Sequence, residues 1–272
     1  MVELFDVSGK TAVVTGGGGI LCSEMAIALA DRGVKVAILD INEEEAKAVA
    51  ERITAEGGEA IAIATNVLDK ASLEKARDVV IENYGTVDIL INGAGGNKPE
   101  ATASDSMSFF DIPADAIQWV FNLNIIGTVL PTQVFGKVMA ERGEGVIINM
   151  SSMAAFKPLT RTVAYSAAKA AVSNFTQWMA VHFSQNYSTN IRVNALAPGF
   201  FLTNQNYYLL VDKETGEPTE RGRQIIGHTP MGKYGAPGDL IGTLLWLVSD
   251  ASSFVNGVVV PVDGAFSAFS GV

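Results

Sequence analysis

Short apolar runs alternate with longer stretches of helical pattern along the whole chain of 272 residues. The runs are candidate strands at 11–15, 35–40, 60–65, 88–92, 145–151, 191–198 and 257–263. The helical stretches lie at 20–32, 43–56, 71–84, 113–142, 162–187 and 237–250. Strands that are apolar along their length are typical of parallel sheets covered on both faces, with helices as crossovers. The pattern therefore predicts an α/β fold with a doubly wound, parallel, seven-stranded sheet and helices on both faces.

No composition shift, internal repeat or low-complexity segment divides the chain, so we predict one Rossmann-type domain over residues 1–272. The stretch at about 203–230 breaks the regular alternation, because it separates the sixth strand from the last helix and contains turn signals at 214–218. Long excursions of this kind are usually functional. We expect this one to be a substrate lid.

Charge and composition exclude several classes of protein. The net charge is −10, which repels phosphate backbones and anionic lipid surfaces, so neither nucleic acid nor membrane is an expected partner. No apolar run reaches the roughly 20 residues of a membrane helix, and the acidic N-terminus lacks a signal-peptide pattern. The single cysteine, Cys22, cannot form an internal disulfide. These features favour the cytoplasm. No cluster has metal-site spacing, so we expect no metal.

A glycine-rich turn follows the first predicted strand, with Thr15 followed by glycines at 16–19. Small residues there let the backbone approach a pyrophosphate, and the helix that follows offers free N–H donors. A tight turn without a ligand is the alternative. Asp40 ends the second predicted strand, where a carboxylate accepts hydrogen bonds from ribose hydroxyls and repels a 2′-phosphate. A helix cap is its alternative role. We therefore expect NAD(H) to be favoured over NADP(H).

Tyr165 and Lys169 are four residues apart in a predicted helix, so their side chains share one face. Ser152 directly follows the fifth predicted strand, at the carboxyl edge of the sheet where ligands bind in this architecture. A phenol has an unperturbed pKa of about 10, and a neighbouring ammonium favours the phenolate. The three residues indicate acid–base catalysis, although a surface pair and a cap would show the same spacing.

Together these motifs resemble the short-chain dehydrogenase/reductase family over essentially the whole chain. The motifs that carry the resemblance, in order, are Thr15-Gly16, Asn92-Gly93-Ala94-Gly95, Asn124, Ser152, Tyr165 with Lys169, and Pro198-Gly199 with Thr203. The resemblance implies that Tyr165 exchanges a proton, Ser152 orients the substrate oxygen, Lys169 holds the nicotinamide ribose and Asn124 anchors a relay water. It implies cofactor contacts at Gly16, Gly18, Gly19, Ile20, Asp40, Asn66, Val67, Asn92, Gly93, Ala94, Tyr165, Lys169, Pro198, Gly199, Phe201 and Thr203.

The chain departs from the family pattern in the glycine turn. Ile20 and Cys22 stand where members often have glycine, so we expect Gly19 to make the turn. Cys22 is expected to be a small packing residue, with a reactive thiol near the helix N-terminus as the alternative.

Several segments, including NGAGGNKPEAT and APGFFLTNQN, resemble a branch of the family that interconverts D-fructuronate and D-mannonate. We expect a sugar-acid substrate, with another polyol or a keto-gluconate as the alternative and a non-catalytic nucleotide sensor as a distant one. Polar side chains suited to a hydroxylated acid are Lys98, Ser152, Arg161, Asn204, Gln205 and Asn206. The resemblance and the apolar tail at 265–269 lead us to expect a homotetramer.

Overall fold

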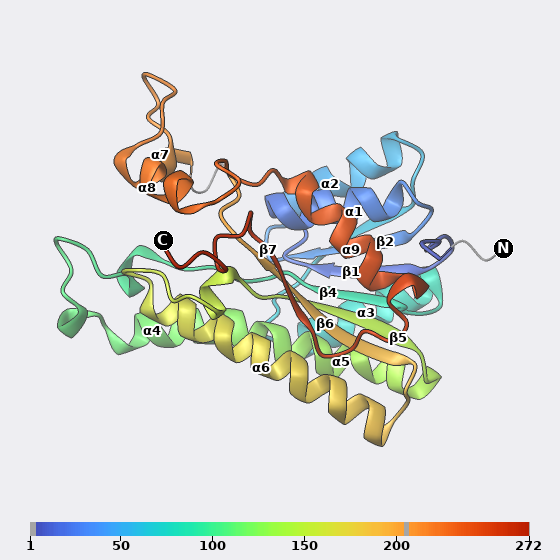
Figure 1. Ribbon diagram of the computed structural model, residues 1–272. Helices are drawn as coiled ribbons and strands as arrows, with labels where there is room; N and C mark the ends of the chain where they lie inside the picture. Colours follow the sequence, from blue (N-terminus) through green and yellow to red (C-terminus); the bar gives the residue numbers. More distant parts are fainter. Residues whose placement is uncertain (1–3, 204–206, 272) are drawn as a thin grey trace.

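The computed structural model describes residues 4–203 and 207–271, and seven strands in these ranges form one parallel sheet (Figure 1). The strands are β1 (Thr11–Thr15), β2 (Lys35–Asp40), β3 (Ala60–Ala64), β4 (Ile89–Asn92), β5 (Gly145–Met150), β6 (Ile191–Pro198) and β7 (Val259–Val262). Their order is β3-β2-β1-β4-β5-β6-β7, and every neighbouring pair is parallel. The predicted Rossmann-type sheet is therefore confirmed.

Helices cover both faces of the sheet. Their bounds are α1 (Ile20–Ala30), α2 (Glu43–Ala55), α3 (Lys70–Tyr84), α4 (Ala114–Phe121), α5 (Gly127–Arg142), α6 (Val163–Asn186), α7 (Tyr207–Leu210), α8 (Glu220–His228) and α9 (Ile241–Val248). Successive strand residues point to opposite faces: Val14 packs with α1, α2 and α9, whereas Val13 packs with α3, α5 and α6. The buried strands therefore lie between two helical layers (Figure 1).

The predicted helix at 113–142 is interrupted. A π-helical turn at Asn122–Ile126 separates α4 from α5, because the Asn124 side chain donates to the Val120 carbonyl and so takes an acceptor of the regular helix. The predicted excursion at 203–230 contains α7 and α8, which its polar and turn-rich sequence did not indicate.

The chain reverses direction in the sheet at β1. It runs outward through β2 and β3 on one side, then returns to β4 on the other. Loops leaving β1 and β4 diverge at their carboxyl ends, and ligands bind at such a switch point in open α/β sheets. The site is therefore to be sought at this edge.

Candidate active site

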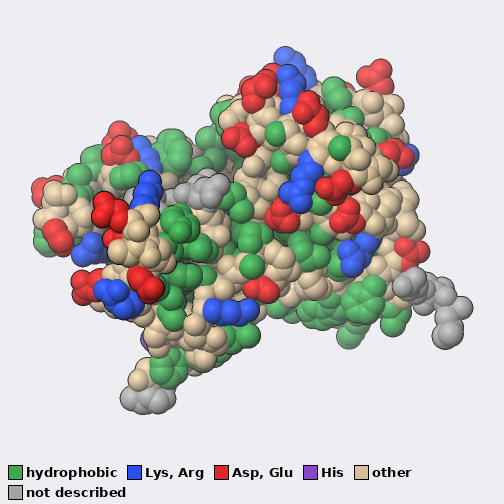
Figure 2. Space-filling model, turned by 90° about the horizontal axis from the view of Figure 1, so that it is seen from above, with side chains coloured by type: hydrophobic (Ala, Val, Ile, Leu, Met, Phe, Trp, Pro, Cys, Tyr) green, Lys and Arg blue, Asp and Glu red, His purple; other side chains and the backbone are tan. Residues whose placement is uncertain are grey.

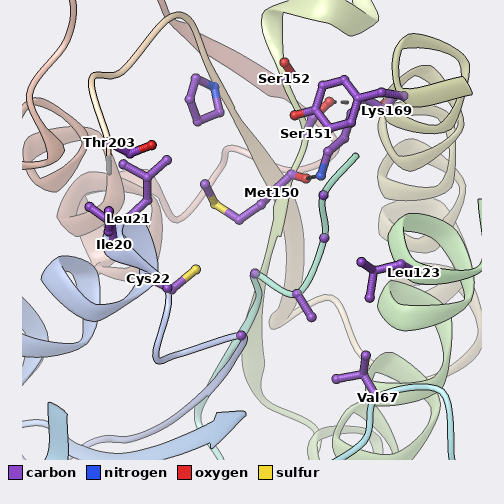
Figure 3. Close-up of a pocket in the computed structure, with 18 of the residues that line it drawn as sticks. Ile20, Leu21, Cys22, Val67, Leu123, Met150, Ser151, Ser152, Lys169 and Thr203 are labelled. Atoms are coloured by element: carbon purple, nitrogen blue, oxygen red, sulfur yellow. Dashed lines mark hydrogen bonds between the residues drawn. The ribbon is translucent and has the colours of Figure 1, made fainter. Parts of the chain in front are cut away.

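A cavity of about 640 Å³ lies at the carboxyl ends of the central strands. Figure 3 shows one wall formed by Ile20 and Leu21, with Ser152 and Lys169 across the opening. The cavity is lined by most of the predicted residues: Gly16, Gly19, Ile20, Asp40, Asn66, Val67, Gly93, Ala94, Ser152, Tyr165, Lys169, Pro198, Gly199, Phe201 and Thr203. The structure thus brings both predicted groups, cofactor and catalytic, into one space.

The glycine turn after β1 leaves room for a ligand. Gly16 has a left-handed φ of +62°, and a Cβ there would lie 2.8 Å from the Ala94 backbone, so only glycine fits. Gly19 precedes α1 without a side-chain cap. The first-turn N–H groups of α1, beginning at Ile20, are therefore offered to an anion, as a pyrophosphate requires. The Gly19 N–H itself donates to the Gly16 carbonyl at 3.0 Å.

Gly18 has a different role from the one predicted. Its N–H donates to Asp40 Oδ2 at 3.0 Å, and it is not part of the cavity lining. Since this donor is already used, Gly18 orients the Asp40 carboxylate instead of meeting the pyrophosphate. The Asn42 N–H holds the other carboxylate oxygen at 3.0 Å.

Asp40 itself faces the cavity beside Ile41, Thr65, Asn66 and Val67, which form one end of it. Its alternative role as the cap of α2 is excluded, because Asn42 is the N-cap and accepts from the Glu44 and Glu45 amides. Both carboxylate oxygens keep further lone pairs for ribose hydroxyls.

Glycines also open the floor of the cavity. A Cβ on Gly93 would collide with Cys22 Sγ, and one on Gly95 would lie 2.8 Å from Asn124 Oδ1 and 3.2 Å from Lys169 Nζ. A flat dinucleotide fits against a backbone that is kept bare in this way. Burial raises the pKa of the Cys22 thiol to about 12, so Cys22 packs against the turn and is not a reactive thiolate.

Asn92 is the second predicted cofactor residue outside the lining. It is 1% exposed, and its Nδ2 donates to Asn149 Oδ1 on β5 and to Thr132 Oγ1 on α5. Its side chain therefore ties β4 to its neighbours beneath the cavity and reaches no ligand there.

The catalytic candidates converge as the spacing predicts. The Ser152 hydroxyl lowers the pKa of the Tyr165 phenol and accepts the Ala154 N–H at 3.1 Å. Lys169 is 5% exposed. Its Nζ donates to the Met150 carbonyl at 2.7 Å (Figure 3) and lies 5.6 Å from the centre of the Tyr165 ring.

The expected lowering of the phenol pKa by Lys169 is not what this site shows. Burial raises the pKa of Tyr165, and only the Ser152 hydrogen bond opposes it. Burial also lowers the pKa of Lys169 to about 8. The Lys169 ammonium donates to the Met150 carbonyl, and Lys169 is not one of the groups that shift the pKa of Tyr165. The phenol is consequently protonated at neutral pH, which suits a proton donor.

Asn124 is fully buried. Its Nδ2 donates to Gly96 and Val120 carbonyls at 2.7 and 2.8 Å, and its Oδ1 accepts from the Gly96 N–H. The side chain therefore clamps the loop after β4 across the π-helical turn. Its predicted role in holding a relay water stays a prediction.

The residues predicted to bind substrate lie in different places. Ser152 faces the cavity, whereas Asn204, Gln205 and Asn206 fall outside the described residues. Arg161 is half exposed, pairs with Asp105 at 3.2 Å and is not in the lining. Lys98 lies beside the lining.

Lys98 Nζ is 5.4 Å from the Trp119 ring centre, and Trp119 does line the cavity. Of the described acidic groups, none forms an ion pair with Lys98. Lys98 is therefore more available than Arg161 to bind a substrate carboxylate.

Sequence reasoning missed three apolar residues that line the cavity, Trp119, Met153 and Leu159. Trp119 and Leu159 carry no motif, and their place depends on how α4 and the loop before α6 fold over the sheet. A helical amphipathic pattern would have favoured burial of Trp119, not exposure to a ligand.

The described ranges 4–203 and 207–271 contain neither a candidate metal site nor a candidate membrane-spanning helix. No group of three or more His, Cys, Asp and Glu residues could hold a metal ion there. No helix in these ranges has both the length and the apolar character needed to cross a bilayer. Figure 2 shows acidic and basic side chains interspersed on one face, without a continuous basic patch.

The family model and the similar proteins agree on one family for this chain. Residues 10–213 match the family model described as short chain dehydrogenase. An uncharacterized oxidoreductase, UxuB, of Bacillus subtilis is 51% identical over the whole of both chains. A crystal structure from Haemophilus influenzae with bound NAD, provisionally identified as a D-mannonate oxidoreductase, is 49% identical, has a TM-score of 0.92 and covers 98% of both chains.

Two Escherichia coli proteins with named activities are more distant. A 2-dehydro-3-deoxy-D-gluconate 5-dehydrogenase is 33% identical, covering 98% of this chain and 99% of its own. A 7alpha-hydroxysteroid dehydrogenase is 32% identical, covering 95% and 94%. At this identity the family spans sugar acids and steroids, so substrate must be argued from the site.

Proposed function

Because the chain belongs to the short-chain dehydrogenase/reductase family, we propose that it is an NAD-dependent oxidoreductase that interconverts D-fructuronate and D-mannonate. The observation that carries the reaction type is that Ser152, Tyr165 and buried Lys169 line one cavity, whose other residues fit a dinucleotide. A nucleotide sensor would have no need of a phenol, hydroxyl and ammonium in this arrangement.

The residues divide the work of reduction between them. Bound NADH would supply the hydride to the carbonyl carbon, and the first-turn N–H groups of α1, Asp40 and the bare glycine floor fit such a dinucleotide. The Tyr165 phenol donates its proton to the carbonyl oxygen as the alcohol forms. Ser152 donates its O–H to the same oxygen. Lys169 uses one N–H on Met150 and keeps two for a ribose and for replenishing the phenol proton.

We expect NADH to be used in preference to NADPH. The Gly18 and Asn42 amides fix the Asp40 carboxylate at the cavity, and a carboxylate at the end of the second strand repels a 2′-phosphate. Replacing Asp40 by Ser should therefore reduce the ratio of kcat/KM values for NADH over NADPH by roughly tenfold or more, since repulsion of one anion by another is removed. Steady-state kinetics with both cofactors measure the ratio.

The control for this test is Glu44→Ser, which removes a carboxylate that is 86% exposed at the start of α2. It should leave the ratio unchanged. A wild-type enzyme with a lower KM for NADPH than for NADH would contradict the assignment of Asp40.

Three features support a hexuronate as the substrate. The solved structure with 49% identity is described as acting on mannonate, Lys98 offers a cation beside the cavity wall, and Ser152 faces the reacting centre. The apolar lining residues Trp119, Met153 and Leu159 favour a second candidate substrate, a hydrophobic alcohol such as a hydroxysteroid. Another polyol or a keto-gluconate asks for the same polar groups as a hexuronate.

Comparing kcat/KM for fructuronate with kcat/KM for its uncharged analogue fructose tests whether the site recognises a carboxylate. We expect kcat/KM to be about 10- to 100-fold higher for the acid, since a charge-assisted hydrogen bond contributes roughly 1.5–3 kcal/mol. Lys98→Ala should abolish the preference. Arg161→Ala is the matched control, because Arg161 is paired with Asp105 outside the lining.

Equal kcat/KM values for fructuronate and fructose would contradict both the proposed carboxylate site and the hexuronate proposal. Faster turnover of 5-keto-gluconate or of a 7-hydroxysteroid would assign the site to one of the alternatives. If only Arg161→Ala lost the preference for fructuronate over fructose, Arg161 and not Lys98 would be assigned as the residue that binds the substrate carboxylate.

We also propose a homotetramer in the cytoplasm. The tail at 265–269 no longer supports assembly, because Phe266 and Phe269 contact rings of their own chain. Other apolar side chains do: Trp178 and Val181 on α6 are each 55% exposed, and Phe254 is fully exposed. Light scattering should give a mass four times that of the chain. A monomeric mass would contradict this.

A further inference from the structure

The last described residues turn back over the excursion between β6 and α9. We call residues 263–269 the C-terminal clasp; they form part of the red end of the chain in Figure 1. The Phe266 ring lies 4.6 Å from the His228 ring, edge to face, and the Phe269 ring lies 5.1 Å from it. His228 ends α8. The clasp therefore packs two aromatic rings against the residue that ends this helix.

The backbone of the clasp is itself fixed. The Asp263 carboxylate accepts from the Ala265 and Ser267 amides at 3.0 and 2.9 Å. The Gly264 carbonyl accepts the Met231 N–H, which ties the clasp to the residues just after α8. These bonds set the direction in which the rings of Phe266 and Phe269 point.

The same clasp touches the wall of the active-site cavity. Phe266 packs against Phe200 with 5.2 Å between ring centres, and Phe200 lines the cavity. Phe200 and Phe266 also pack on a small core made of Leu210, Val211 and Ile225, which joins α7 to α8. One cluster of rings thus connects the C-terminus, the excursion and the cavity.

We propose that Phe266 and Phe269 are positioning residues for the substrate, acting through His228 and Phe200. They hold α8 over the carboxyl edge of the sheet and keep the Phe200 wall in place, so they set substrate affinity and leave hydride and proton transfer unchanged. This inference rests on the proposed function, in which the excursion containing α7 and α8 covers the substrate.

The test is Phe266→Ala, compared with Phe5→Ala, which removes a ring that is 52% exposed and has no described ring contacts. For a carbonyl compound that the wild type reduces, Phe266→Ala should raise KM roughly tenfold, since loss of an aromatic pair with its burial is of this order. The values of kcat and of the NADH Kd should stay within about twofold. Phe266→Tyr, which keeps the ring, should restore KM.

Hydrogen exchange gives a second readout that needs no substrate. In Phe266→Ala, amides of α8 should exchange at least about tenfold faster, while those of β5 are unchanged. If no tested compound is reduced by the wild type, the proposed function fails, and the exchange result alone supports or overturns the clasp. Unchanged exchange in α8 overturns the proposal, as does an unchanged KM or an equal loss of NADH affinity.

Discussion

Tyr165→Phe should lower kcat by about 10²- to 10⁴-fold while NADH still binds, because this change removes the proton donor and little else. The Tyr165 ring packs on the cluster of Ala101, Ala116, Val120 and Ala164, and phenylalanine fills the same space. The phenol is the group whose pKa the Ser152 side chain lowers. Its loss leaves the carbonyl oxygen without a donor of suitable pKa, because Lys169 is held at Met150.

The control is Tyr84→Phe, which removes a phenol at the end of α3, far from the catalytic residues in the chain. That variant should keep its activity. Fluorescence titration with NADH should give a Kd within about twofold of wild type for Tyr165→Phe, since its change affects the transition state and not cofactor binding. Activity within about tenfold of wild type would show that another group supplies the proton.

The sheet could be predicted because buried parallel strands have a distinctive composition. Val36 to Leu39 and Ile89 to Ile91 are apolar without alternation and are buried, since helices cover both faces. The way in which the helix N-termini are capped was harder to predict. Asn42 and Asp69 cap α2 and α3 with their side chains, whereas α1 has none because its N-terminus faces the cavity.

The catalytic residues could be predicted because helical spacing places Tyr165 and Lys169 on one face whatever the tertiary structure. Gly18 and Asn92 could not be assigned correctly in the same way. A motif shows that a residue type is needed, but not whether its polar group meets a ligand or another part of the protein. Gly18 meets Asp40 and Asn92 meets Asn149, contacts that only the folded sheet brings together.

The protonation of the site also depended on tertiary structure. Spacing placed an ammonium one helical turn from Tyr165, which favours a lowered phenol pKa. The folded site buries both groups and directs Lys169 Nζ to the Met150 carbonyl, so burial dominates and the pKa of Tyr165 rises. The sequence could not show which acceptor the ammonium would find.

Arg192→Met should lower the free energy of unfolding by about 2–4 kcal/mol, through loss of hydrogen bonds that no apolar side chain replaces. Arg192 interrupts the apolar strand β6 and is 7% exposed. Its guanidinium donates to the carbonyls of Leu247 and Ser249 and to Ser252 Oγ at 2.8 to 3.0 Å. These carbonyls end α9, where helices leave acceptors unpaired and favour a cation.

Methionine has a similar length, so the change leaves little cavity and removes the charge along with the donors. At the buried helix end, the Leu247 and Ser249 carbonyls then keep only the donors of Ser252. Thermal unfolding should show a midpoint roughly 5–15 °C lower. Arg32→Met is the matched control: Arg32 is exposed and makes one long bond to Ala28, so its loss should cost less than about 0.5 kcal/mol. Equal midpoints for both variants would mean that α9 is held by its apolar face on the sheet, without help from Arg192.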